Sequence, residues 1–357
     1  MNNVYARDGS QEFNQRLENT LSRIADKVES EMGANLISLI LGGGYGRGEG
    51  GVVIKNGMEM PYNDLDFALV VANKSKVPWD KLNSIRNEFA GELGIHVDFS
   101  RPLTVKDIEN WPFWLMWFDL INGHISLKGP TELLKRHAPD FFSKPLPVIE
   151  GTRLLLNRGA GMLWALRVVR NVEKEPDEDF VRRNYYKCAL ALGDSLLIAF
   201  KRYTTQYFGR DTLIRDLSFD EPEVRLLDLL EMYEEALKFK FRPDLVSTDS
   251  KSENEIIELA CKWGKTFLLV ETVRTGRQWK SLDEYIEWHG TRERDQHTLK
   301  AIFRNIFYNI SMGKISLRYP REDLYRQLPL LLGLVEKVCD DWPVESGKFL
   351  KVWDRFN

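Results

Sequence analysis

The sequence predicts an α+β protein in which a small mixed-sheet domain, residues 1–145, precedes a large all-helical domain, residues 150–357. Two observations support this division. Up to about residue 145, short apolar runs with the length of strands alternate with amphipathic helical segments. Beyond the Pro-containing segment 144–151, which we interpret as a linker, almost every segment has helical periodicity and strand patterns are essentially absent.

The first domain begins with an amphipathic helix over residues 11–32, because its apolar residues recur at helical spacing. A second helix is expected at 79–93, between the second and third strands. Four short apolar runs predict the strands of a mixed sheet, at 36–41, 65–71, 95–100 and 124–129.

The second domain is expected to contain about 8–10 helices, without internal repeats. Near the junction of the two domains, the aromatic segment WPFWLMWF, residues 111–118, predicts core or interdomain packing, with a base-stacking platform as the alternative. Helical periodicity is clearest at 152–171, 180–203, 222–239, 252–275 and in the region 330–342.

Bulk composition is typical of a soluble globular protein. Of the 357 residues, 43% are hydrophobic and 29% are charged. The net charge of −3 gives no positive field over the whole protein, so a nucleic-acid partner is not expected. The first residues contain no apolar signal-peptide core and no run of about 18 apolar residues occurs, so we expect a cytoplasmic protein without a membrane partner.

A glycine-rich loop, LILGGGYGRGEGG at residues 39–51, follows the first strand. Gly46, Gly48 and Gly51 satisfy the dinucleotide-binding pattern G-x-G-x-x-G, but the following GVVIKNGMEM lacks the helix that a pyrophosphate site requires. A P-loop is excluded because no Gly-Lys-Ser/Thr ends the run, and a protein-kinase loop because no His-Arg-Asp or Asp-Phe-Gly follows. Taken alone, the loop is either a tight structural turn or a phosphate cradle.

Three acidic residues after the loop favour the phosphate cradle. Asp64 and Asp66 stand two apart at the start of the second strand, so both carboxylates project from one face of the sheet. Asp98 is an isolated acid in the apolar third strand. If the third strand pairs with the second, the three carboxylates converge. Such a group repels itself unless a cation lies within it, and hard oxygen ligands are those that Mg²⁺ uses in phosphate chemistry.

The order of strand, glycine pair, Asp-x-Asp and a later Asp resembles the DNA polymerase beta-type nucleotidyltransferase superfamily, over about residues 35–130. LGGGYGRGEG, residues 41–50, is similar to the loop of its minimal bacterial members, in which an Arg-Gly-Glu follows a Gly-Ser pair. The resemblance implies that Asp64 and Asp66 are the metal-binding pair and that Asp98 is the third carboxylate.

Within the loop, the resemblance assigns Gly43 and Gly44 to the Gly-Ser pair, and Arg47 and Glu49 to the Arg-Gly-Glu. Arg47 then either contributes charge to the phosphates or braces the loop through Glu49. Gly44 departs from the usual serine, so backbone amides alone would contact the triphosphate there. The stretch before the first Asp is longer than in the minimal enzymes, which predicts an inserted hairpin around VVIKNGMEM.

The helical half adds candidate phosphate ligands. Segments 151–166 and 183–203 resemble helices that follow the catalytic domain in several bacterial members. Lys187, on the second of them, is either a ligand of the β- and γ-phosphates or a solvated lysine. Asn157 and Arg158 are further candidates of the same kind.

The resemblance implies a magnesium-dependent nucleotidyltransferase that moves a nucleoside monophosphate, expected to be AMP, from an NTP to a hydroxyl group and releases pyrophosphate. Two Mg²⁺ ions are expected on Asp64, Asp66 and Asp98, and Asp98 is a candidate proton acceptor. The acceptor is a small molecule or a protein, since the near-neutral charge argues against RNA. Two alternatives stay open: a nucleotide-binding regulatory module without turnover, and a helical interaction scaffold.

The cysteines and histidines suggest no other chemistry. Cys188, Cys261 and Cys339 lie far apart in apolar or helical segments, which indicates three buried thiols rather than disulfides or a zinc site. His96 stands two residues before Asp98 and points to the same face. We expect a core histidine there, with a supporting role beside Asp98 as the alternative.

Overall fold

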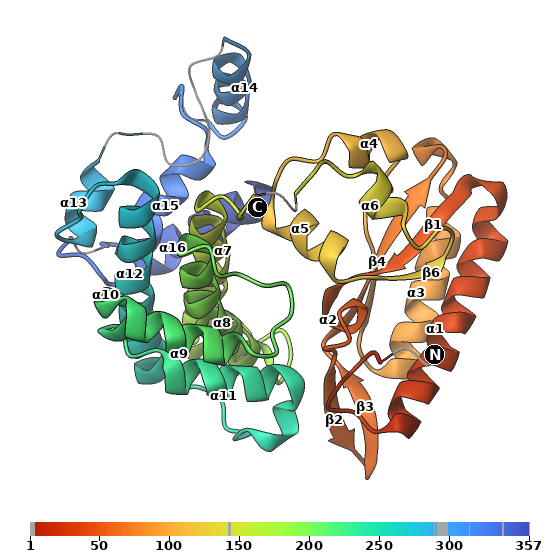
Figure 1. Ribbon diagram of the computed structural model, residues 1–357. Coiled ribbons are helices and arrows are strands. Elements are labelled where there is room, and N and C mark those ends of the chain that lie inside the picture. Colours follow the sequence, from red (N-terminus) through yellow and green to blue (C-terminus); the bar gives the residue numbers. More distant parts are fainter. Residues whose placement is uncertain are drawn as a thin grey trace. The chain divides into compact units, whose positions relative to one another are not determined.

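Figure 1 shows a computed structural model of the chain, which describes residues 4–141, 144–288, 290, 299–313, 315–337 and 339–356. The chain forms two compact units. The first consists of Met1–Leu146 and of two segments from later in the chain, Tyr203–Arg210 and Leu237–Thr248. The second consists of Pro147–Arg202, Asp211–Ala236 and Asp249–Asn357.

A four-stranded mixed sheet forms the centre of the first unit. Strand β1 is antiparallel to β4 and β6, whereas β4 and β5 are parallel, so helix α3 carries the chain back between them. Each strand agrees with its predicted range to within one residue at either end. The strands are β1 (Leu36–Leu41), β4 (Asp64–Val71), β5 (His96–Phe99) and β6 (Ile125–Lys128), in the order β5-β4-β1-β6.

Helices α1 (Gln11–Met32) and α3 (Trp79–Leu93) have the bounds that the sequence predicts. Their apolar side chains pack in one core with Leu65 and Phe67, the odd-numbered residues of β4. Helix α1 begins after Ser10, whose hydroxyl accepts a hydrogen bond from the backbone N–H of Phe13 at 3.1 Å. One face of the sheet is therefore covered by these helices.

The opposite face of the sheet packs against the aromatic segment and its helices. Ala68 and Val70, the even-numbered residues of β4, lie in this second core. Trp111 is buried there and stacks on Trp117 with ring centroids 4.1 Å apart, which confirms the core packing that the sequence predicts. The helices of this face are α4 (Val105–Glu109), α5 (Leu115–Asn122) and α6 (Leu133–His137).

The glycine-rich stretch and the segment after it connect β1 to β4. A four-residue helix, α2 (Gly43–Gly46), is followed by the hairpin of β2 (Gly51–Lys55) and β3 (Met58–Tyr62), which confirms the predicted hairpin. The turn residues Asn56 and Gly57 both have positive φ, 52° and 76°, as tight hairpin turns of the I′ type require.

After α6 the described chain consists of helices and the connections between them, and it contains no strand. The α+β fold class is therefore confirmed. Among these helices none combines the length and apolarity needed to cross a bilayer. They are α7 (Ile149–Val169), α8 (Phe180–Ala199), α9 (Arg210–Asp220), α10 (Pro222–Arg225), α11 (Leu230–Phe241), α12 (Glu253–Thr275), α13 (Leu282–Glu287), α14 (Leu299–Ile310), α15 (Arg321–Leu331) and α16 (Trp342–Phe356). Short 3₁₀ helices are η1 (Gly33–Asn35), η2 (Lys74–Lys76) and η3 (Pro243–Leu245).

Three predictions for the helical half are wrong. Segment 222–239 is not one helix, because Asp228, at φ 50°, separates α10 from α11. The region 330–342 is mainly the connection between α15 and α16, in which Gly333 has φ 71°. A left-handed residue ends helical hydrogen bonding in both places. Of the three free cysteines Cys188 alone is buried, whereas Cys261 lies on the solvent side of α12.

Candidate active site

Three carboxylates lie on one face of the sheet, on the neighbouring parallel strands β4 and β5. Asp66 is directly opposite Asp98 in the strand register, and Asp64, two residues earlier, is opposite His96. Because side chains alternate along a strand and registered neighbours share a face, all three acids project to the same side. The pairing on which the sequence argument depends is therefore present.

The same alternation keeps the acids out of the main hydrophobic core. Leu65 and Val97 are buried between the carboxylate positions, whereas Asp66 and Asp98 are exposed and Asp64 is half-buried. The acids lie on the face that Ala68 and Val70 occupy further along the strand. The face therefore changes from apolar to acidic along β4, and its acidic end is accessible.

His96 is exposed, so the expectation of a core histidine is wrong. It occupies the first position of β5 and faces the same side as Asp98. A short strand of four residues leaves its first side chain at the sheet edge, where burial is incomplete.

The glycine loop runs directly against one of these acids. The N–H of Gly42 donates a hydrogen bond to the carbonyl oxygen of Asp66, at 2.8 Å. Gly43 has φ 60°, and a Cβ added to it would overlap Oδ2 of Asp66. A side chain at position 43 would therefore be strained and would also displace the carboxylate. This is the close backbone approach that the glycine run suggests.

Gly44 is less tightly constrained. A Cβ there would lie 3.2 Å from the carbonyl oxygen of Glu49, a single close contact. The same segment is tied by a hydrogen bond from the N–H of Glu49 to the carbonyl of Gly44, at 2.8 Å. The loop therefore closes at Gly44 through its own main chain.

Tyr45 joins the loop to the β2–β3 hairpin. Its buried hydroxyl donates to the carbonyl of Gly51 at 2.6 Å and accepts from the N–H of Tyr62 at 2.8 Å. Burial raises the pKa of the Tyr45 hydroxyl, so it stays neutral and can make both bonds. We did not identify this residue from the sequence, although an aromatic side chain inside a glycine run is an available signal.

Glu49 holds a segment from much later in the chain. It is buried, and its two carboxylate oxygens accept hydrogen bonds from the N–H groups of Tyr207 and Phe208, at 2.9 and 2.8 Å. Its contact with Arg47 is longer, 3.8 Å from Nε to Oε2. Glu49 thus anchors the segment Tyr203–Arg210 to the loop more strongly than it braces Arg47.

Three cations surround the ring of Tyr207 beside the glycine loop. The charged groups of Arg47, Arg210 and Lys240 lie 5.7, 3.8 and 4.3 Å from its centroid. Burial, together with the charges of Arg47 and Arg210, lowers the pKa of Lys240 to about 7. Sequence reasoning missed Arg210 and Lys240, because they come from the helical half and no local motif marks them.

Arg47 is mostly buried, and within the described residues its Nε has no hydrogen-bond partner. Its side chain also fills the space beside Gly123, where an added Cβ would overlap it. A buried guanidinium with incomplete hydrogen bonding favours the approach of an anion.

Lys187 lies outside the first unit, half-buried on α8 of the second unit. Asn157 and Arg158 also belong to the second unit, on α7. Their contact with nucleotide phosphates stays a prediction.

The strand register places the backbone positions of the acids close together. Among the described residues, no three His, Cys, Asp or Glu side chains are grouped as a metal site. The strand register places the Cα atoms of Asp66 and Asp98 one strand spacing apart, about 5 Å. Carboxylates at this spacing repel one another unless a cation lies between them. The donor set is one that Mg²⁺ prefers.

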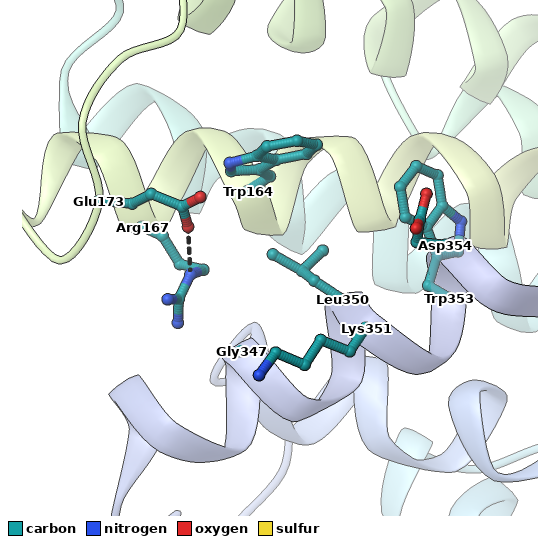
Figure 2. Close-up of a pocket in the computed structure, with 8 residues that line it drawn as sticks. All are labelled: Trp164, Arg167, Glu173, Gly347, Leu350, Lys351, Trp353 and Asp354. Carbon is teal, nitrogen blue, oxygen red and sulfur yellow. Dashed lines mark hydrogen bonds and ion pairs between the residues drawn. The ribbon is translucent and has the colours of Figure 1, made fainter.

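A separate cavity of about 420 Å³ lies between α7 and α16 in the second unit (Figure 2). The indole rings of Trp164 and Trp353 line it with Leu350, and Arg167 donates a hydrogen bond to Glu173 at 3.0 Å. The predicted site residues are not among those that line this cavity.

Neither the family models nor the curated proteins with which the chain was compared match it. The resemblance to nucleotidyltransferases therefore depends on the motif residues and on their geometry.

Proposed function

We propose that the first unit is a magnesium-dependent nucleotidyltransferase of the DNA polymerase beta type, which transfers AMP from ATP to a hydroxyl group of a small molecule or a protein. The observation that carries the proposal is the register of β4 and β5, with Asp66 opposite Asp98 and the glycine loop against Asp66. Glycine loops with acids at this position suit the binding of a triphosphate with its cations.

Each residue has a proposed part in the reaction. Asp64, Asp66 and Asp98 would together hold two Mg²⁺ ions. When bound, these ions would lower the pKa of the acceptor hydroxyl and neutralise charge on the triphosphate. The hydroxyl oxygen forms a bond to the α-phosphorus, its proton passes to Asp98, and the bond from the α-phosphorus to the bridging oxygen breaks to release pyrophosphate.

The surroundings of the acids support triphosphate binding. Gly43 leaves room for the Asp66 carboxylate beside the loop, and the main-chain N–H groups of the loop are the proposed donors to phosphate oxygens. Arg47 and Lys240 supply positive charge on the same side of the loop, and Lys187 is a third candidate from the helical half.

Replacing Asp66 by Asn tests the proposal. We expect nucleotidyl transfer to fall by about a thousand-fold or more, because one cation ligand and its charge are lost. Folding should be unchanged or improved, since repulsion among the acids is relieved. Labelled ATP and Mg²⁺ are incubated with the protein and a cell extract, and label is measured in the protein and metabolite fractions.

The exposed Asp80→Asn on α3 is the matched control and should retain activity. Undiminished transfer by Asp66→Asn would contradict the proposal. The alternative function is nucleotide binding without turnover. Retained ATP binding with no pyrophosphate release by the wild type would identify that function.

A further inference from the structure

The cavity between α7 and α16 lies within the second unit and has a volume of about 420 Å³ (Figure 2). Cavities of this size accommodate small organic molecules. In Figure 2 the pair of Arg167 and Glu173 lies at one end, Trp353 and Asp354 lie at the other, and the indole ring of Trp164 lies between them. The cavity therefore has charged ends and an apolar middle.

Arg167 is fixed in the wall of this cavity and keeps one donor unused. The residue is only 9% exposed. Its Nε donates to Glu173 at 3.0 Å, and its Nη1 donates to the carbonyl of Pro343 at 2.6 Å and to the hydroxyl of Ser346. Within the described residues Nη2 makes no hydrogen bond, yet this atom is reachable by solvent. A guanidinium held in this way presents a free charged donor to an oxyanion.

Gly347 of α16 keeps the space in front of that donor open. A Cβ added to Gly347 would lie 3.5 Å from Nη2 of Arg167. Glycine is unfavourable in the interior of a helix, because it loses more backbone freedom than alanine on folding. The residue that leaves the donor uncovered is therefore one that weakens its own helix.

Lys351 adds a second cation at the same end. It stands four residues after Gly347, on the same side of α16, and Figure 2 shows it extending toward the end that holds Arg167. In the described part of the chain Lys351 has no ion pair or hydrogen bond. Glu173 is already paired with Arg167, and Asp354 lies at the opposite end. The Arg167 end therefore has an excess of positive charge.

The two tryptophans favour an aromatic ligand with hydrogen-bond acceptors. The indole N–H groups of Trp164 and Trp353 are buried, and no acceptor for either occurs among the residues that the structure describes. Unpaired donors leave positive potential in the cavity wall, which favours an anion and opposes a cation. The rings themselves offer flat apolar surface, on which another aromatic ring packs well.

We propose that this cavity binds a small aromatic molecule that carries a single carboxylate. The carboxylate oxygens accept hydrogen bonds from Nη2 of Arg167 and from the ammonium group of Lys351. The aromatic ring packs against Trp164 and Leu350 in the middle of the cavity. Asp354 at the far end repels a second carboxylate, so dicarboxylates are excluded. The proposal is independent of the function of the first unit.

Isothermal titration calorimetry of the full chain with three probes of one shape tests the proposal. Naphthoate should bind at least about tenfold more tightly than neutral naphthylmethanol or cationic naphthylmethylammonium, because only naphthoate satisfies the free donors. Lys351→Met should weaken naphthoate binding by about tenfold or more, since one charged donor is lost. Gly347→Ala should weaken it as well, because its methyl group stands in front of Nη2 of Arg167.

Lys348→Met is the matched control. Lys348 is an exposed lysine on the same helix, pairs with Glu345 at 2.7 Å and lies outside the cavity lining that the described residues form. This variant should bind naphthoate like the wild type. Absence of naphthoate binding by the wild type at millimolar concentration would overturn the proposal. Equal or tighter binding of either of the other probes, or unchanged naphthoate affinity in Lys351→Met or Gly347→Ala, would overturn it too.

Discussion

At the scale of single residues, Lys240 is a lysine whose surroundings oppose its charge. Burial and the neighbouring Arg47 and Arg210 lower its pKa to about 7, and Glu49 and Asp64 offset this only in part. A cation held in this way destabilises the folded protein unless an anion adjoins it. Proposed phosphate binding would supply that anion and return Lys240 to its charged form.

Lys240→Met should make the folded protein more stable at neutral pH. Below pH 7 the lysine is charged in both folded and unfolded chains, so the folded protein bears the full free-energy cost of enclosing that charge. From pH 7 to the unfolded pKa, near 10.5, the unfolded chain binds the extra proton, so wild-type stability rises with pH. The variant should gain on the order of 1–3 kcal/mol at pH 7, and the gain should shrink by pH 10.

Urea unfolding at several pH values measures this difference. The matched control is Lys238→Met, an exposed lysine two residues earlier on α11, which should show little change at any pH. A gain for Lys240→Met that does not depend on pH would show that packing, not charge, is responsible.

Much of the acidic part of the site can be predicted from sequence, because it depends on local rules. Alternation along a strand puts Asp64 and Asp66 on one face, and a short buried run places Asp98 on a neighbouring strand. The role of Glu49 cannot be predicted in this way. Its hydrogen-bond donors are the backbone N–H groups of Tyr207 and Phe208, which are about 160 positions away and have no side-chain signature.

At the scale of elements, a buried carboxylate ties three helices of the second unit together. Glu271 of α12 is fully buried and accepts hydrogen bonds from Thr152 of α7 at 2.6 Å and from Tyr285 of α13 at 2.9 Å. On its own helix it pairs with Arg274, whose Nε lies 2.6 Å away. The Glu271 carboxylate accepts hydrogen bonds from three partners at once. Without it, these buried groups would have lost their acceptor.

Glu271→Ala should destabilise the second unit by about 3–5 kcal/mol, because it leaves Arg274 and two hydroxyl groups without their acceptor. Denaturant unfolding followed by circular dichroism measures the shift in midpoint. Glu258→Ala, an exposed change on the same helix, should stay within about 0.5 kcal/mol of the wild type. A loss below about 1 kcal/mol for Glu271→Ala would mean that water replaces the lost acceptor.

The bounds of a helix can be predicted from the sequence where its amphipathic periodicity ends at a capping residue or a glycine. Helices α1 and α3 have their predicted bounds because a long apolar stripe coincides with a capping residue or a final glycine. The continuous periodicity over 222–239 does not predict the break at Asp228. Asp tolerates the left-handed conformation found there, but its presence in a sequence does not predict that conformation.

At the scale of the whole molecule, each compact unit is built from segments that are separate in the sequence. Two segments of the helical half, Tyr203–Arg210 and Leu237–Thr248, belong to the first unit. Beyond the contacts of Glu49, the Tyr203 hydroxyl donates to Asp119 at 3.0 Å and Phe239 packs edge-on against Tyr62. The segments complete the unit, and no composition change in the sequence marks where they begin.

A fragment of residues 1–146 should therefore be less stable than the same unit within the full chain. It lacks the N–H groups of Tyr207 and Phe208, so the buried Glu49 carboxylate loses its partners at a cost of about 3–5 kcal/mol. Hydrogen exchange of the β1 and β4 amides compares the unit in both contexts, and protection should be lower in the fragment. Glu49→Met supplies the control, because it should raise protection in the fragment, where the charge is unpaired, and lower it in the full chain, where the charge is satisfied. Equal protection of the two wild-type forms would show that the later segments rest on the first unit without stabilising it.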